Sequence, residues 1–253
     1  MRFSVIIPSY DQVAYIEDTL RNLNEIKKTI GDKGHELEIL LFDSESDKEV
    51  QTIIQKYRSI IDHLEIKKDK GQFDAINKGI KKCSGQYWTW LNTDDTLDSE
   101  GILKLAEILK KDDSIDYIYG SIDHMNDAGK FTKRYDAFQL DLNTMITKVP
   151  GIFQQGSFFK KKFTDKIGLI KEYNCCFDYE YVLRCLKNGA KIYKCDFKVG
   201  NFRLHSNSKT GSIIPMFIQD QLTISKEYGR KWYHFLTWFS HLRLIKHKLF
   251  PRK

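Results

Sequence analysis

The sequence contains no long apolar stretch. A helix that crosses a membrane needs about 20 consecutive apolar residues, and no comparable uncharged run occurs in this chain of 253 residues. Met1 and Arg2 lead directly into FSVIIP, which is too short an apolar run for a secretory signal. We therefore expect a protein that is made in the cytosol and does not span a membrane.

Cysteine is scarce, and its spacing is not that of a metal or redox motif. The five cysteines are an odd number and form no CxxC pair: Cys83, Cys175, Cys176, Cys185 and Cys195. The usual spacing of a zinc site or a thiol redox pair is therefore absent. We expect reduced thiols, as in cytosolic proteins.

Several motifs that would mark other enzyme classes are missing as well. Neither GxxxxGK[ST] nor GxGxxG is present, so ATPases and dinucleotide-dependent oxidoreductases lose their main support. HExxH and GxSxG are also absent, which leaves zinc peptidases and serine hydrolases without support.

Positively charged residues outnumber negatively charged residues. Lys and Arg number 41 against 34 Asp and Glu, a net charge of +7. Such a balance favours anionic partners, namely a nucleotide, a nucleic acid or a membrane surface. The sign alone does not choose among them. The length suits one α/β domain with a sizeable core.

Short apolar runs alternate with amphipathic segments along the first half of the chain. The apolar runs predict strands at 3–8, 37–42, 63–68, 87–91 and 116–120, and the segments between them predict helices at 13–29, 47–61, 72–82 and 100–111. This βαβ alternation predicts an α/β fold, a mostly parallel sheet with helices on both faces. Ligands of such sheets bind beyond the carboxyl ends of the strands.

Acidic residues follow four of the predicted strands. They are Asp11, Asp43 with Asp47, Asp69, and the pair Asp94 and Asp95. Carboxylates gathered at one sheet edge repel one another, and a divalent cation with oxygen ligands would offset that repulsion. The alternative is that each acid caps a helix or a turn, which is the reading we prefer for Asp47 and Asp98.

An ordered set of motifs resembles a known family. The motifs are SVIIPSYDQVAYIEDTL, ILLFDSESD, DKGQFDAINKGI, GQYWTWLNTDD, QQGSFFKKKF, CFDYEYVLR and FRLHSNSKT. Together they resemble the inverting glycosyltransferase family 2 of the bacterial cell-surface polysaccharide type, whose members have the A-type nucleotide-diphospho-sugar transferase fold. The likeness covers roughly residues 3 to 210. It implies a catalytic domain at 1–210, with a nucleotide-binding half at about 1–120 and an acceptor half at about 121–210.

Three positions depart from the family pattern. Glu45 adds a negative charge where relatives usually have a small or glycine-rich turn, Asp11 replaces the commoner asparagine, and Asn92 stands where many relatives have the first aspartate of a DxD motif. These changes bear on base preference and metal affinity, and leave the reaction class unaffected.

The resemblance implies a donor site built from several loops. Its expected members are Pro8, Ser9, Tyr10, Asp43, Asp69, Gly71, Asn92 and Asp94. Tyr10 would offer a ring face to the nucleobase, and Asp43 and Asp69 would accept hydrogen bonds from base or ribose. Gly71 would allow close approach of the backbone.

The same resemblance implies a metal site and a catalytic base. Asp94, Asp95 and His205 are the expected ligands of Mg²⁺ or Mn²⁺, without a preference between the two aspartates. Asp178, at the start of a predicted helix over about 178–188, would be the base that takes the acceptor proton. The alternatives are that Asp178 only caps this helix, or that Glu180 is the base.

Residues 211–253 fall outside the resemblance and form a basic, aromatic tail. Apolar residues recur there at helical spacing, at Trp232, Phe235, Leu236, Phe239, Leu242, Ile245 and Leu249. Such a helix would lie on an anionic membrane or pack on the catalytic domain, and both remain open.

The function that these observations predict is transfer of a sugar from a nucleotide-diphospho-sugar, with a UDP-sugar favoured, to a glycan or polyprenyl-linked glycan. The expected location is the cytoplasm, with peripheral attachment to the inner face of the cell membrane through the tail. A non-catalytic or nucleic-acid-binding α/β protein is the alternative, and we expect no nucleic acid partner because the acid-lined edge would repel phosphates.

Overall fold

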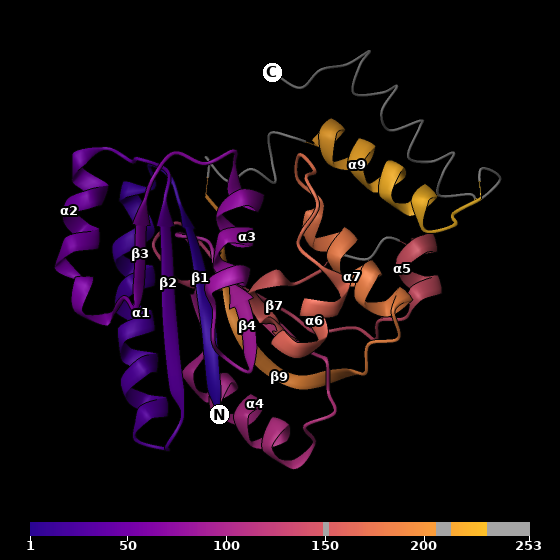
Figure 1. Ribbon diagram of the computed structural model, residues 1–253, viewed down its shortest axis with the longest axis horizontal. Helices are drawn as coiled ribbons and strands as arrows, with labels where there is room; N and C mark the ends of the chain where they lie inside the picture. The colour runs from indigo at the N-terminus through magenta and orange to yellow at the C-terminus, as the bar shows by residue number, and fades with distance from the viewer. Residues whose placement is uncertain (149–151, 206–213, 232–253) are drawn as a thin grey trace. The chain divides into compact units, whose positions relative to one another are not determined.

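The computed structural model describes residues 1–148, 152–205 and 214–231 (Figure 1). The chain forms two compact units. The first, called the sheet unit, comprises residues 1–138, 153–169 and 190–204, and the second, called the helical unit, comprises 139–152, 170–189 and 205–253. The units alternate along the chain, so neither is a continuous segment. The predicted division into halves near residue 120 follows function and stays a prediction.

The sheet unit contains one sheet of nine strands. The strands are β1 Arg2–Ser9, β2 Glu36–Asp43, β3 His63–Ile66, β4 Tyr87–Trp90, β5 Thr96–Leu97, β6 Tyr117–Met125, β7 Phe131–Tyr135, β8 Ser157–Lys160 and β9 Ile192–Arg203. Their order is β3-β2-β1-β4-β8-β6-β9-β5, and β7 pairs with β6. The two longest ladders, β1 with β2 and β6 with β9, are both parallel. The sheet is therefore mostly parallel, as predicted.

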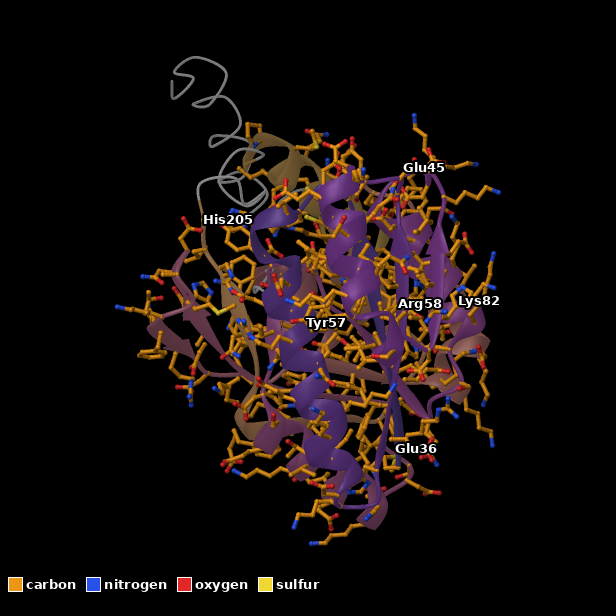
Figure 2. All side chains as sticks on the ribbon, turned by 90° about the vertical axis from the view of Figure 1, so that its left-hand side faces the viewer. Glu36, Glu45, Tyr57, Arg58, Lys82 and His205 are labelled. Carbon is orange, nitrogen blue, oxygen red and sulfur yellow. The ribbon has the colours of Figure 1, made fainter. Side chains whose placement is uncertain are left out.

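Strands β3, β2, β1 and β4 run side by side in the same direction (Figure 1). Their carboxyl ends therefore share one edge, where Ser9 lies opposite Asp43 in the register. Figure 2 shows the length of β2 between Glu36, at its amino end, and Glu45, just beyond its carboxyl end. The four acidic loops predicted from the sequence all leave this carboxyl edge.

Helices connect the strands. In the sheet unit they are α1 Val13–Gly31, α2 Lys48–Lys56, α3 Gln72–Lys82, α4 Ser99–Lys111 and α6 Lys161–Ile167, with 3-10 turns at Arg58–Ile60 and Gln154–Gly156. Among the described residues of the helical unit they are α5 Leu142–Lys148, α7 Phe177–Lys187 and α9 Ile214–Glu227, of which α9 follows the last strand. No helix among the described residues is long and apolar enough to span a membrane.

The core of the sheet unit follows from alternation along β1. Phe3, Val5 and Ile7 are fully buried in one cluster with Ile16 and other apolar side chains of α1. Successive side chains of a strand point to opposite faces. Ile6 therefore faces the other way, where a side chain added at Gly79 of α3 would meet it at 2.3 Å. Thus α1 and α3 cover opposite faces of the sheet.

The predicted elements of the first half are confirmed, and the differences have local causes. The predicted helix 47–61 ends at Lys56 and continues as a 3-10 turn, and the predicted helix 100–111 begins one residue earlier, behind its cap. Asp98 is that cap, because its carboxylate accepts the N–H of Gly101 at 2.9 Å. Of the predicted tail 211–253, residues 214–231 are described; the amphipathic stretch from Trp232 onward lies outside the described residues.

Candidate active site

Asp43 is the hub of the loops after β1 and β2. Its side chain is 1% exposed, and its carboxylate accepts the hydroxyl of Ser9 at 2.8 Å, the hydroxyl of Ser46 at 2.5 Å and the N–H of Ser46 at 2.9 Å. A carboxylate has about four acceptor positions. One position therefore remains after these three bonds, on the oxygen that binds the N–H of Ser46.

Asp11 ties the same two loops together from the other side. Its N–H donates to the hydroxyl of Ser46 at 2.9 Å, and its carboxylate accepts the N–H of Asp47 at 2.8 Å. Its φ of 46° lies in the left-handed region, which Asn and Asp tolerate better than other residues. This explains why an aspartate can stand where the family commonly has asparagine. Glu45, with φ 56°, is exposed and shares this backbone conformation.

The loop after β3 is joined to its neighbour in the same manner. The N–H of Asp69 donates to the hydroxyl of Ser44 at 3.1 Å, and the carboxylate of Asp69 accepts the N–H of Gly71 at 2.8 Å. Gly71 precedes α3 with φ 116°, a backbone conformation that favours glycine. The predicted residues Asp43, Asp69 and Gly71 thus belong to one hydrogen-bonded group of loops.

The predicted base-binding residues differ in exposure. Ser9 is buried against Asp43, Pro8 is half-buried, and Tyr10 is 68% exposed. A tyrosine ring exposed to this extent at the carboxyl edge has a free face for a planar ligand.

The two aspartates after β4 have different environments. Asp95 is 0% exposed. One of its oxygens accepts the N–H of Arg203 at 3.0 Å, and the other accepts the side-chain amides of Gln155 at 2.8 Å and Asn92 at 3.2 Å. Asp94, in contrast, is half-buried. Asp95 is therefore fixed from three directions, whereas Asp94 retains access to solvent.

This acidic pair suits a divalent cation. Burial first, and the neighbouring carboxylate of Asp94 second, raise the pKa of Asp95 to about 8. A nearby cation would favour the ionised form that both carboxylates need as ligands. Carboxylate oxygens are also the donors that Mg²⁺ and Mn²⁺ prefer. The donor set of this motif thus fits the expected metal.

Arg203 is a site residue that the sequence reasoning missed. Besides its N–H bond to Asp95, its Nε donates to the backbone oxygen of Asp94 at 3.0 Å, and its guanidinium pairs with Asp18 at 3.2 Å and lies 4.9 Å from the ring centre of Tyr15. Its side chain is buried. The residue stands within the motif FRLH, but only the pairing of β9 with β5, the short strand directly after Asp95, shows that it reaches the acidic motif.

Gln154 and Gln155 reach the acidic motif with their side chains. Both side chains are buried. The amide of Gln154 donates to the backbone oxygen of Trp90, the last residue of β4, and the amide of Gln155 donates to Asp95. Both residues therefore support the acidic motif from the 3-10 turn at 154–156. Asn92 is linked further to Gln72 of α3 at 2.6 Å.

Asp178 lies in the first turn of α7, in the helical unit. The N-cap position is Cys176, two residues before Asp178. Its carboxylate accepts the N–H of Tyr179 at 2.8 Å. Although part of the side chain is exposed, loss of water around the carboxyl group on burial raises its pKa to about 6. A carboxyl group with that pKa is ionised near neutral pH and is a stronger base than an ordinary aspartate.

Glu180, the alternative base, is fully buried and already occupied. Its carboxylate pairs with Arg184 at 2.9 Å and with Lys171 at 3.3 Å, and it accepts the hydroxyl of Tyr228 at 2.7 Å. This arrangement is typical of a structural anion and leaves it unsuited to take a proton from an acceptor. His205, the remaining predicted ligand, is half-buried and follows β9 two residues after Arg203.

A cavity of about 490 Å³ also lies in the sheet unit, and none of the predicted site residues lines it. Most of its charged groups are paired. Arg203 and Arg21 bind Asp18, and Lys198 binds Asp98 at 2.8 Å. The cavity therefore presents little unbalanced charge to an ionic ligand, and the acidic motif after β4 is the stronger candidate for a donor site.

Comparison with known proteins identifies the family. Residues 4–178 match the model of glycosyl transferase family 2. A PGL/p-HBAD biosynthesis glycosyltransferase of Mycobacterium bovis is 24% identical over 197 residues, which is 75% of this chain and 72% of that protein. An uncharacterized glycosyltransferase of Rickettsia prowazekii is 31% identical over 147 residues, covering 55% of this chain and 44% of that protein.

Solved structures share the fold. The structure of residues 1–349 of TarS from S. aureus, in complex with UDP-GlcNAc, has a TM-score of 0.68 at 17% identity and covers 100% of this chain and 74% of that one. The mannosyltransferase PcManGT from Pyrobaculum calidifontis, in complex with GDP-Man and Mn²⁺, has a TM-score of 0.64 at 15% identity, covering 97% and 70%.

The chain therefore belongs to glycosyl transferase family 2 and has an A-type glycosyltransferase fold. It is a glycosyltransferase that uses a nucleotide-sugar donor.

Proposed function

We propose that the protein is an inverting, metal-dependent glycosyltransferase that transfers a sugar to a hydroxyl of a glycan or lipid-linked glycan. The observation that carries this proposal is the asymmetry of the acidic pair after β4. Asp95 is buried and bound by Arg203, Gln155 and Asn92, while Asp94 keeps access to solvent beside the loops of the parallel strands. A buried, hydrogen-bonded carboxylate next to an accessible carboxylate is an arrangement that suits a site for a metal ion and a diphosphate.

The nucleoside would bind at the loops after β1, β2 and β3. The exposed ring of Tyr10 would stack on the base, with Pro8 and Ser9 beside it. Asp43 has one acceptor position left, which suits a single N–H donor such as the imide of uracil. This supports UDP as the nucleotide, as does the bound ligand of the TarS structure. Asp69 would accept a second hydrogen bond from base or ribose, and Gly71 would leave room for the ligand.

Asp94 would be the principal ligand of Mg²⁺ or Mn²⁺, with Asp95 and His205 as further ligands. The ion supplies positive charge that stabilises the leaving nucleoside diphosphate when it is bound. Asn92 would bind the ribose or a ligating water. The PcManGT structure contains Mn²⁺ with its donor, which supports use of a metal in this fold.

Asp178 would act as the base. Its carboxylate would accept the proton of the acceptor hydroxyl while the oxygen forms the new bond to the anomeric carbon. The bond from that carbon to the diphosphate oxygen breaks in the same displacement, which inverts the configuration.

The name of the Mycobacterium bovis relative links it to PGL/p-HBAD biosynthesis, which supports a role in making envelope glycans or polysaccharides. We place the reaction on the cytoplasmic side of the cell membrane, with peripheral attachment through residues 211–253.

A thermal-shift screen tests the donor site. The purified full chain is heated with UDP, GDP, dTDP, CMP or ADP, each with Mn²⁺ and with EDTA. A ligand that binds only the folded state raises the melting temperature by an amount set by its concentration relative to its dissociation constant. We expect a shift with UDP that disappears in EDTA. The absence of a shift with every nucleotide, in folded protein, would overturn the proposal.

A second measurement tests the base. Asp178→Asn should abolish sugar transfer and leave the nucleotide shift unchanged, because the two sites lie on different segments. Near-normal turnover by Asp178→Asn would show that Asp178 is not the base.

A further inference from the structure

Helix α9 lies beyond the segment that matches the family model, which ends at residue 178. Side chains of α9 and of the residue after it nevertheless bind residues on either side of Asp178 in the chain. Helices α9 and α7 both belong to the helical unit (Figure 1). The functional meaning of this contact rests on the proposed role of Asp178 as the base.

Asp220 of α9 holds the loop that precedes α7. Its side chain is 6% exposed. It accepts the N–H of Cys175 at 2.9 Å and the side-chain amide of Asn174 at 3.3 Å. A buried carboxylate that accepts a backbone N–H fixes the position of that backbone, because breaking the bond would leave a buried charge with fewer partners. The loop is thus fixed three residues before Asp178.

The adjacent thiols strengthen this contact. Cys175 Sγ donates to Asp220 at 3.5 Å, and Cys176 Sγ donates to the backbone oxygen of Phe217 at 3.6 Å. These two cysteines and Asp220 place their ligand atoms within 4.8 Å of one another, a spacing that a metal ion could also use. Burial, and then the charge of Asp220, raise the pKa of Cys175 to about 11. Neutral thiols therefore link the loop to α9 as hydrogen-bond donors.

Tyr228, just after α9, holds the other side of Asp178. Its hydroxyl donates to Glu180 at 2.7 Å, and Glu180 also pairs with Arg184 and Lys171. Lys171 reaches Glu227 at 3.8 Å, and the hydroxyl of Tyr173 donates to Glu227 at 3.1 Å. The first turn of α7 is thus fixed two residues after Asp178 as well.

Asp178 itself depends on this backbone. Its carboxylate accepts the backbone N–H of Tyr179. Among residues 1–148, 152–205 and 214–231, no side chain donates a hydrogen bond to it. Its position is therefore set by the course of the loop and the first turn of α7. Catalytic rates are sensitive to such placement, because a shift of about 1 Å can cost roughly 100-fold.

We propose that Asp220 and Tyr228 are positioning residues, which hold Asp178 in place for proton transfer from the loop side and the helix side. Helix α9 is then part of the catalytic apparatus of this chain, although it lies outside the matched family segment. Neither residue touches the reacting atoms.

The first test measures hydrogen exchange in the full chain. Asp220→Ala and Tyr228→Phe should speed amide exchange in peptides covering 173–181 and leave peptides covering 36–47 unchanged. Gln219→Ala, an exposed neighbour on α9, is the control for Asp220, and Tyr193→Phe, an exposed tyrosine, is the control for Tyr228. Exchange at wild-type rates in both variants would overturn the proposal without reference to any activity.

The second test measures release of UDP from UDP-GlcNAc, with water as the acceptor, in the presence of Mn²⁺. Asp220→Ala should lower kcat by about tenfold or more and leave KM within about twofold, since it disturbs the base and not the donor loops. Tyr228→Phe should lower kcat by about threefold, since one hydrogen bond is lost. Asp220→Asn keeps an oxygen that can accept the N–H of Cys175 and should restore most of the rate. If Asp220→Ala fails to fold, Asp220→Asn takes its place as the test variant.

The pH profile separates positioning from a general loss of stability. Wild-type kcat/KM should fall below about pH 6, and this acid limb should shift or disappear in Asp220→Ala.

An inactive Asp178→Asn together with wild-type kcat in Asp220→Ala and Tyr228→Phe would overturn this inference and leave the proposed function intact. If wild type and Asp178→Asn released UDP at the same rate, or if neither released any UDP, the proposed function would be contradicted for this donor. The hydrogen-exchange experiment would then decide whether α9 holds the loop.

Discussion

Asp95 and Asp94 have different roles at the acidic motif after β4. Asp95 accepts three buried donors, and its replacement by alanine would leave the N–H of Arg203 and the amides of Gln155 and Asn92 without their acceptor. Each unsatisfied buried group costs about 1–3 kcal/mol. We expect Asp95→Ala to lower the melting temperature of the metal-free protein markedly.

Asp94→Ala should behave differently. It removes a charge that opposes ionisation of Asp95 and leaves the three donors of Asp95 in place. The melting temperature without metal should therefore fall less than in Asp95→Ala, while the Mn²⁺-dependent shift with UDP should disappear. Glu100→Gln, at an exposed acid in the same segment, is the control. An unchanged UDP shift in Asp94→Ala would assign the metal to other residues.

Asp178 should make folding less stable as pH rises. Its folded-state pKa is about 6, whereas an unfolded aspartate has a pKa of about 4. Between about pH 4 and pH 6 the folded state therefore retains a proton that the unfolded state releases, so the free energy of unfolding falls as the pH rises through this window and stays at the lower value above it. Asp178→Asn should raise the melting temperature near pH 7.5 and have no such effect near pH 4. A lower melting temperature at both pH values would show that its charge has a stabilising partner.

At the scale of elements, the packing of α4 on β9 depends on a glycine. A Cβ at Gly101 would lie 2.2 Å from the backbone oxygen of Lys198, which cannot rotate away as a side chain can. Gly101→Ala should cost about 1–3 kcal/mol, and each kcal/mol lowers the melting temperature of a domain of this size by about 2–4 °C. Gly31→Ala, at the end of α1 with no atom within 4 Å of the added Cβ, is the matched control. Equal melting temperatures in the two variants would contradict this packing.

The sequence was informative for elements whose pattern is local. The strands around Val5 and Ile39 and the cap at Asp98 were predictable, because alternation and capping involve neighbouring residues. The short strand β5, at Thr96–Leu97, and the role of Arg203 were not, since both depend on pairing with distant segments. The hydrogen bond between Glu180 and Tyr228 could not be predicted from the sequence either, because the two residues lie 48 positions apart.

The charge of the whole molecule also leads to a prediction. The net charge of +7 would favour nucleic acid, but Asp11, Asp69 and Asp94 are accessible acids at the carboxyl edge of the sheet, where we propose that the donor binds. We expect no binding of a 20-base-pair duplex tighter than about 10⁻⁵ M at physiological salt, measured by fluorescence polarisation with and without Mn²⁺. Tighter binding that weakens steeply with salt would point to a second, basic surface.

The order of the strands has a consequence for synthesis of the protein. Asp95 is bound by groups from residues 155 and 203, and the strand that directly follows it, β5, pairs with β9. A ribosome adds about 5–20 residues each second, so the 108 residues between positions 95 and 203 take roughly 5 to 20 seconds. During that interval the emerging chain carries its acidic motif without the strand that holds it, and Asp95 cannot gain all of its partners until about four-fifths of the sequence has been made.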